Sequence, residues 1–198
     1  RSPEKKWSPA ELEAAVAEHL QGRPAWRYGR WCFFPWSGRL VHLLPKEEFK
    51  ELRLDRNRYK ITREEQETLS RFHIGVVGLS VGQASAVCLA TEGVGGALRL
   101  ADFDELGLSN LNRLRAGVHQ LGLPKTVLAA QAIYELDPYA DLSLFHQGID
   151  EDNLDAFLLH PRPLDLLIEE CDDLAIQVRL RQRAQELGIS VLMDRCDR

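Results

Sequence analysis

The sequence predicts an α/β protein in which a Rossmann-like, mostly parallel sheet is flanked by helices and follows a small N-terminal α+β extension. From residue 73 onward, strand-like apolar segments alternate with helical segments. This order is typical of right-handed βαβ units. The first such strand also ends in a glycine turn, at Gly78 and Gly82, that leads into a helix. We therefore divide the chain into an extension over residues 1–55 and an α/β domain over residues 56–198.

The extension is expected to contain a helix and a β-hairpin. A capping-box pattern begins at Ser8, and apolar residues follow it at helical spacing. Two β-rich runs, residues 30–36 and 39–45, are separated by Ser37-Gly38, a two-residue hairpin signal. The aromatic residues of the extension could line a pocket, but we expect them to pack into a small core or to dock on the α/β domain. They are Trp26, Tyr28, Trp31, Phe33, Phe34 and Trp36.

The α/β domain is expected to begin with a helix from the capping box at Thr62 to about Arg71. The expected strands cover residues 73–78, 97–102, 141–146, 164–170 and 189–194, and the expected helices cover residues 81–93, 124–136, 150–159 and 172–187. Because the chain stops just after a strand, we expect it to be a fragment of a longer protein, truncated at the C-terminal end of this domain.

Composition narrows the classes of function. The formal net charge of −5 argues against nucleic acid as the main partner. No apolar run approaches the roughly 20 residues of a membrane span, and no signal-like apolar block opens the chain, so we expect a cytoplasmic protein without a membrane partner. The four cysteines form no CxxC pair, and Cys88, within an apolar stretch, is expected to be a buried small hydrophobe. No structural metal is expected.

The glycine turn is the first feature that suggests chemistry. Gly78 and Gly82 enclose a G-x-x-x-G pattern, with Ser80 near the place of the middle glycine of a dinucleotide motif. A glycine turn after the first strand lets the backbone approach phosphates and directs a helix N-terminus at them. The same pattern also suits a turn that needs glycine only for packing.

Acidic residues follow the second strand. Asp102 and Asp104 lie about 20 residues beyond the glycine turn, where a Rossmann-type site holds ribose hydroxyls. Two acids at a strand end also occur in solvated turns and helix caps. The combination with the glycine turn favours a nucleotide.

The loop after these acids favours a triphosphate. The loop and the helix start after it supply an amide, from Asn110, and two cations, from Arg113 and Lys125, which suit the β- and γ-phosphates of a triphosphate. Asp172 follows a later strand and is expected at the carboxyl edge of the sheet, where it is suited to holding Mg²⁺. Asp173 is also suited to capping the helix that follows it. Taken one at a time, Arg113 and Lys125 would more often be surface charges.

These segments together resemble the ThiF/MoeB family, relatives of ubiquitin-activating enzymes. The matching stretches are GVVGLSVG, EGVGGALRLADFDELGLSNLNR, GLPK, ELDPY and DLLIEECDD, within residues 56–194. The resemblance implies a ThiF-type nucleotide-binding domain that binds ATP and Mg²⁺. It implies adenylation of the C-terminal carboxylate of a small β-grasp carrier protein, or of another carboxylate acceptor, with release of pyrophosphate. It also implies a homodimer.

The resemblance assigns roles to individual residues. Asp102 would hold the ribose, and Asp172 would bind Mg²⁺ and support adenylation. Asn110, Arg113 and Lys125 would grip the phosphates. The family also has an arginine before the first strand that reaches the partner subunit's site; Arg56 or Arg58 could fill this place, and we favour Arg56.

Several positions depart from the family pattern. The glycine turn is one residue shorter, and Cys171 and Asp173 replace a usual threonine and asparagine. Cys196 is assigned no role. The GLSVG variant resembles a bacterial subgroup in which this domain is fused to a nitroreductase-like domain. Two alternatives remain: a nucleotide-binding regulatory or docking module without catalysis, and an NAD-dependent oxidoreductase, which the fold alone suggests.

Overall fold

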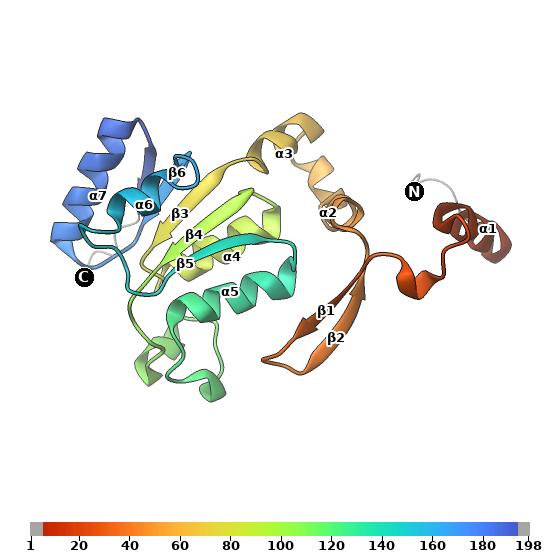
Figure 1. Ribbon diagram of the computed structural model, residues 1–198, viewed down its shortest axis with the longest axis horizontal. Helices are drawn as coiled ribbons and strands as arrows, with labels where there is room; N and C mark the ends of the chain where they lie inside the picture. The colour runs from red at the N-terminus through yellow and green to blue at the C-terminus, as the bar shows by residue number, and fades with distance from the viewer. Residues whose placement is uncertain (1–5, 194–198) are drawn as a thin grey trace. The chain divides into compact units, whose positions relative to one another are not determined.

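The computed structural model describes residues 6–193, which form two compact units divided between Asp55 and Arg56 (Figure 1). Each unit is described by itself below. Asp194, the end of the last expected strand, and Cys196 lie outside the described residues. Within the described range, no helix has both the length and the apolar character needed to cross a membrane.

The first unit contains two helices and a hairpin. Its elements are α1 (Pro9–Leu20), β1 (Arg30–Phe34), β2 (Arg39–Leu43) and α2 (Lys46–Arg53). The expected capping box at the start of α1 is confirmed: the Glu11 N–H donates to the Ser8 hydroxyl, and the Ser8 N–H donates to the Glu11 carboxylate. The helix therefore begins where the side chains satisfy its first N–H groups.

The hairpin differs from the expectation. Phe34 pairs with Arg39, so the connecting loop has four residues, 35–38, and not the two residues Ser37-Gly38. Pro35 explains the difference, because it has no N–H to donate to the strand ladder and ends the pairing early. Trp31 and Phe33 do not form an aromatic core within this unit, since both are more than half exposed, whereas Phe34 is buried.

The second unit alternates helices and strands, as predicted. After α3 (Arg63–Leu69), its elements are β3 (His73–Val77), α4 (Gly82–Glu92), β4 (Ala97–Ala101), α5 (Lys125–Leu136), β5 (Asp141–Phe145), α6 (Leu154–Leu159), β6 (Leu166–Glu169), α7 (Leu174–Leu187) and β7 (Ser190–Met193). The helix expected over residues 150–159 begins later, at Leu154. The reason is an Asx turn in which Asp150 accepts hydrogen bonds from the N–H groups of Asp152 and Asn153.

The five strands of this unit form one parallel sheet in the order β5-β4-β3-β6-β7. The chain builds outward from β3 to β4 and β5, then returns to the other side of β3 for β6 and β7. This reversal creates a switch point between the carboxyl ends of β3 and β6. Open α/β sheets bind their ligands at such a point.

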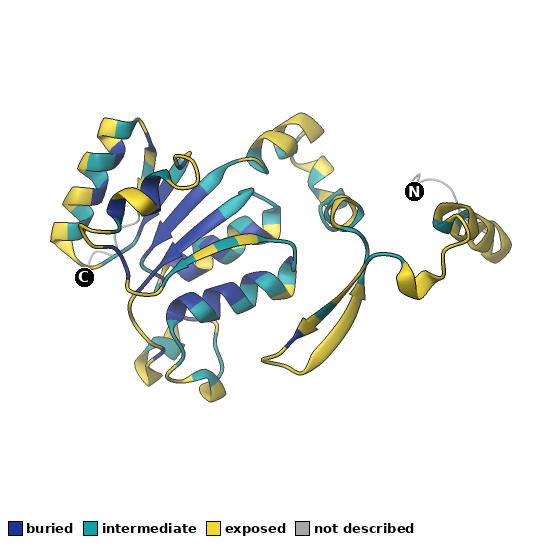
Figure 2. Cartoon of the chain, in the orientation of Figure 1, coloured by how far each residue is buried: buried dark blue, intermediate teal, exposed yellow. Residues whose placement is uncertain are grey.

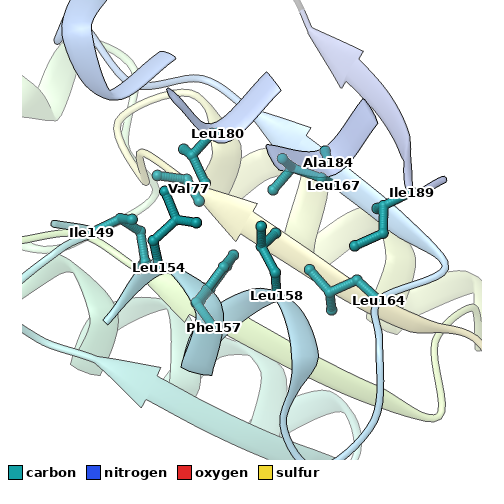
Figure 3. Close-up of a cluster of buried hydrophobic side chains, with 11 residues drawn as sticks. Val77, Ile149, Leu154, Phe157, Leu158, Leu164, Leu167, Leu180, Ala184 and Ile189 are labelled. Atoms are coloured by element: carbon teal, nitrogen blue, oxygen red, sulfur yellow. The ribbon is translucent and has the colours of Figure 1, made fainter. Parts of the chain in front are cut away.

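Helices cover both faces of the sheet, as the expected Rossmann-like fold requires. Alternate residues of β3 point to opposite faces: Val76 packs with α4 and α5, whereas Val77 packs with α6 and α7. Figure 3 shows the second of these clusters, which includes Phe157 and Leu158 of α6 and Leu180 of α7. Strands β3 and β4 are accordingly among the most buried segments (Figure 2).

Cys88 is exposed, which contradicts its prediction as a buried residue. Ala86 and Ala90 of α4 face the sheet, four residues apart on one helix face. Cys88 lies midway between them in sequence, about 200° around the helix from each, and so points outward. An apolar stretch alone did not reveal which face of this small-residue helix would be buried.

Arg99 is a fully buried cation in the centre of β4. Its guanidinium donates hydrogen bonds to the carbonyl oxygens of Phe157 and Arg162, and so fixes the segment between α6 and β6. Burial, and then the nearby cation of Arg162, lower the pKa of Arg99 from its ordinary value. The guanidinium of Arg99 thus has backbone carbonyl partners on the face of the sheet that α6 covers, opposite to α4 and α5.

Candidate functional site

A pocket of about 140 Å³ lies at the carboxyl edge of the sheet, at the switch point between β3 and β6. Four segments that follow strands, together with the starts of α5 and α7, line it. Its predicted members are Gly78, Ser80, Asp102, Asp104, Lys125 and Asp172. Gly82, also predicted, is buried as the first residue of α4 directly behind the turn.

Gly78 allows two connections to meet at this pocket. Its φ of +87° is in the left-handed region, which favours glycine. A Cβ atom at this position would stand 2.5 Å from the carbonyl oxygen of Glu170 and 2.7 Å from the nitrogen of Cys171. The connection between β6 and α7 therefore lies against the glycine turn at a distance that no other residue permits.

Asp102 ties the glycine turn to the end of β4. Its side chain is 8% exposed, and one carboxylate oxygen accepts the N–H of Leu79 at 2.6 Å while the other accepts the N–H of Asp104 at 2.8 Å. Each carboxylate oxygen accepts more than one hydrogen bond. Asp102 can therefore shape the turn and still accept a hydroxyl hydrogen from a ligand.

Lys125 brings a buried cation to the same place. Only 3% of this residue is exposed, and its ammonium donates to the Ser80 hydroxyl at 3.0 Å and to Asp104 Oδ2 at 2.5 Å. Asp102 Oδ1 lies 3.9 Å from the same nitrogen. An ammonium has three donors, so two hydrogen bonds leave one for a ligand at the glycine turn.

The N-terminus of α4 adds partial positive charge behind the turn. Val81 occupies the N-cap position and provides no side-chain hydrogen bond to the helix. The dipole of a helix start favours an anion there. Together with Lys125, it suits the pocket to a phosphate group.

Asp172 provides a carboxylate without a partner. It lies in the connector between β6 and α7, is exposed, and makes no hydrogen bond or ion pair within the described residues. The neighbouring Asp173 caps α7 by accepting the N–H groups of Ala175 and Ile176, as expected. Residues 6–193 contain no group of three or more His, Cys, Asp or Glu side chains that could hold a metal ion by themselves. A lone carboxylate nonetheless fits Mg²⁺, which commonly takes one or two carboxylates together with phosphates and waters.

Cys171 lines the pocket, but it is not poised as a nucleophile. Burial, and then the adjacent carboxylate of Glu169, raise the pKa of the Cys171 thiol to about 12. The thiol therefore stays protonated at neutral pH, whereas the thiolate is the reactive form.

The structure does not bring Asn110 and Arg113 into this pocket. Asn110 accepts the N–H of Gly107 at 2.8 Å and so caps a short 3-10 turn. Arg113 donates to Asn112 Oδ1 at 2.9 Å. Arg113 instead lines a second pocket, of about 310 Å³, with residues of α4 and α5 that include the exposed Cys88.

Arg56 also lies away from the pocket of its own chain. It is exposed in the 3-10 helix η2 (Asp55–Tyr59), whose Asn57 amide donates to the carbonyl oxygen of Glu92 at 2.9 Å. Glu92 ends α4, whereas the pocket lies at the start of that helix. Arg56 is therefore near the opposite edge of the sheet.

Several lining residues were not predicted from the sequence. Phe103 lies between the two predicted acids, and its side chain is 73% exposed beside the pocket. Gly148 and Ile149 follow β5, and Glu170 follows β6. Their position just after parallel strands was the available signal, since such ends meet at one edge of a sheet.

Comparisons with known proteins identify a family, related sequences and a similar fold. Residues 54–196 match the ThiF family. The chain is 50% identical over 169 residues to the uncharacterized protein MT1398 of Mycobacterium tuberculosis, covering 85% of this chain and 23% of that protein. It is 29% identical over 130 residues to the molybdopterin-synthase adenylyltransferase of Haemophilus influenzae, covering 64% of this chain and 51% of the relative.

A solved structure has the same fold. The tRNA N6-threonylcarbamoyladenosine dehydratase TcdA of E. coli, in complex with ATP, superposes with a TM-score of 0.67 at 23% identity. The match covers 72% of this chain and 58% of that chain. The present chain thus spans about a quarter to a little over half of the length of these proteins.

Proposed function

The chain belongs to the ThiF family, and from this premise we propose that it catalyses the ATP- and Mg²⁺-dependent adenylation of a carboxylate, with release of pyrophosphate. The observation that carries the proposal is the joint position of Lys125, Asp102 and Asp172 around the glycine turn. They offer a cation for phosphate, an acceptor for ribose and a ligand for Mg²⁺ in one pocket. The name of the Haemophilus relative, an adenylyltransferase, supports this chemistry.

In the proposed reaction an acceptor carboxylate oxygen attacks the α-phosphorus of ATP. The bond from that phosphorus to the oxygen bridging to the β-phosphorus breaks, and pyrophosphate leaves with the electron pair. The product is a carboxylate–AMP anhydride, and no proton needs to be transferred. Lys125 and the start of α4 stabilise the negative phosphate oxygens, and Asp172 would hold Mg²⁺ where it can offset the charge of the leaving group. The protein contributes position and charge without a covalent step.

The pocket is smaller than the roughly 300–1,000 Å³ of typical ligand sites. We therefore place the ribose and phosphates inside it and let the base extend over the exposed ring of Phe103. An aromatic ring offers a stacking face at little conformational cost. Asn110 and Arg113 lie on the loop between β4 and α5, and they contact the β- and γ-phosphates only if this loop closes over bound ATP.

We further propose that the acceptor is the C-terminus of a small β-grasp carrier protein, or another carboxylate of that kind, and that the enzyme is a homodimer. In that arrangement Arg56 reaches the pocket of a second copy, which accounts for its distance from the pocket of its own chain. The name of the Haemophilus relative, a molybdopterin-synthase adenylyltransferase, supports a protein acceptor.

A binding module without catalysis is the second candidate function. The observation that favours it is the place of Arg113, which lies outside the pocket that contains Lys125. A module of this kind would bind the nucleotide and catalyse no exchange of pyrophosphate into ATP.

A thermal-shift titration with Mg-ATP, ATP plus chelator, and NAD tests the nucleotide assignment. A ligand at 100 times its dissociation constant adds about 2.7 kcal/mol of stability, enough to raise Tm by a few degrees. We expect a Mg²⁺-dependent shift with ATP only. A shift with NAD alone would instead indicate an oxidoreductase.

Pyrophosphate exchange in the presence of a β-grasp carrier protein then tests catalysis. Asp172→Ala is expected to abolish exchange while Tm without ligand stays unchanged, because the Asp172 side chain is exposed and makes no hydrogen bond or ion pair among the described residues. Asp152→Ala removes an exposed aspartate from the turn before α6 and serves as the control. Equal exchange in both variants would contradict the role of Asp172.

A further inference from the structure

We infer that Arg181 is a positioning residue for Asp172 and that it acts through the buried carboxylate of Glu169. The inference rests on the proposed function, because it concerns how Asp172 is held for Mg²⁺. Arg181 lies on α7, outside the residues that line the pocket.

Glu169 connects the helix to the connector that contains Asp172. It is the last residue of β6 and 1% exposed. One of its oxygens, Oε2, accepts from Arg181 Nε at 2.9 Å and from Arg181 Nη2. The other oxygen, Oε1, accepts from the N–H of Cys171 at 3.2 Å and from the Cys171 thiol at 3.4 Å.

Gln177 makes a second connection between α7 and the connector. Its side-chain amide donates to the carbonyl oxygen of Cys171. Arg181 Nη2 lies 3.4 Å from Gln177 Oε1, one helical turn away. Arg181 therefore contacts both side chains that hold the N–H and the carbonyl group of Cys171.

Asp172 is fixed on its other side as well. The carboxylate of Asp173 accepts two N–H groups in the first turn of α7, so the residue after Asp172 is part of the helix cap. The backbone on both sides of Asp172 is thus held by α7, while its own carboxylate has no hydrogen-bond or ion-pair partner between residues 6 and 193. This arrangement fixes the position of the carboxylate and keeps its oxygens available to a cation.

The positive charge of Arg181 also compensates the negative charge of the Glu169 carboxylate. A buried carboxylate needs a partner, and removing that partner is strongly unfavourable. Without Arg181, the buried Glu169 carboxylate would lose its cation and both hydrogen bonds to Oε2, and it would no longer be held in the position that supports Cys171. Residues that orient a metal ligand in this way typically affect metal affinity 10- to 100-fold.

Arg183→Met is the matched control for the test variant Arg181→Met. Arg183 lies on the same helix and pairs with Asp155 at 2.8 Å and with Glu186 at 2.8 Å, away from the connector. Both substitutions remove one ion-paired arginine from α7. Only Arg181→Met removes the support of Cys171.

Two quantities are measured for each variant. The first is the Mg²⁺ concentration at which ATP gives half of its maximal increase in Tm. The second is the increase in Tm that AMP gives without Mg²⁺. For Arg181→Met we expect this Mg²⁺ concentration to rise about 10-fold or more with the AMP shift unchanged. Arg181→Lys, which restores a cation without the paired donors, is expected to recover part of the loss. Arg183→Met is expected to match the wild type in both readouts.

Two results would overturn the inference. The first is an equal Mg²⁺ requirement in the Arg181→Met and Arg183→Met variants, with the wild type showing its Mg²⁺-dependent shift; the proposed function would then stand. The second is a loss of the AMP and Mg-ATP shifts in the same proportion, which would show general damage to the pocket. A wild type without any Mg²⁺-dependent ATP shift would instead overturn the proposed function, and the inference with it.

Discussion

The carbonyl oxygen of Glu170 lies 2.5 Å from the point where a Cβ atom on Gly78 would stand. The glycine turn after β3 and the connection after β6 therefore share one narrow space. This contact sets the shape of the pocket, because Asp172 follows Glu170 by only two residues.

Gly78→Ala is expected to destabilise the fold and to abolish ATP binding. A left-handed backbone angle costs a non-glycine residue about 1–2 kcal/mol, and the contact with the Glu170 backbone adds to this. Gly188→Ala is the control, since Gly188 has φ +69° and nothing within 4 Å of its added Cβ. Urea unfolding and the ATP-induced shift measure both effects. Equal losses of stability in the two variants would show that the backbone contact is unimportant.

Lys125→Met is expected to weaken ATP binding by about 1.5–3 kcal/mol, or roughly 10- to 150-fold, since it removes a charged donor from the glycine turn. It also leaves Asp102 and Asp104 close together without their cation. Lys60→Met, which removes an exposed pair with Glu92, is the control. Isothermal titration with Mg-ATP measures the affinity, and unchanged binding by Lys125→Met would remove Lys125 from the site.

Arg113→Ala is expected to weaken the binding of ATP more than the binding of AMP. If the loop between β4 and α5 closes on ATP, the variant loses about tenfold or more in ATP affinity and changes less than about twofold for AMP. Arg115 lines the same second pocket, so Arg115→Ala is the control. Competition binding with both nucleotides gives the ratio. Equal losses for ATP and AMP would argue against contact with the β- and γ-phosphates.

The free energy of unfolding is expected to depend on pH through the protonation of His73. Burial, and then the cations of Arg162 and Arg99, lower its pKa below the ordinary 6.5, although Asp165 and Asp141 oppose them. Above pH 6.5 the imidazole is neutral in both states. Below it the unfolded chain takes up a proton that the folded chain does not, so stability falls as pH decreases.

His73→Asn should remove this part of the slope, which for one proton is at most about 1.4 kcal/mol per pH unit. Urea unfolding between pH 7.5 and 5.5 measures it, with the exposed His119 changed to Asn as the control. A slope that His73→Asn leaves as steep as in the wild type would assign it to other groups.

The sheet and its order of elements were predictable because their causes are local. Capping boxes at Ser8 and Thr62 begin helices where expected, and β3 and β4 form where the strand-like apolar runs predict them and are buried. The sequence positions of Asp102 and Asp172 after strands also predicted the shared edge, since parallel strands end on the same side.

The structure differs from the expectations where tertiary packing decides. Cys88 is exposed because α4 turns Ala86 and Ala90 toward the sheet, a choice that the apolar stretch alone does not reveal. Arg113 is close in sequence to the acids of the pocket, yet it lines a second pocket at the face of α4 and α5. The contact between Glu169 and Arg181 was not predicted either, since the two residues are 12 apart in sequence, one on a strand and one on a helix.

The reversal of strand order at β3 has a consequence for how the pocket forms. Its two halves come from Gly78 and from Glu170, and they meet only after β6 pairs with β3 across some 90 intervening residues. Contacts of such long range are slow to establish, because the loop between them must first be closed. During synthesis, a chain that has not yet reached Leu166 has the glycine turn, Asp102 and Lys125 but lacks the connector from Glu170 to Asp173 that completes the pocket. If the pocket binds a nucleotide as proposed, that binding is a late event in folding, and a bound nucleotide would report that β6 is in place beside β3.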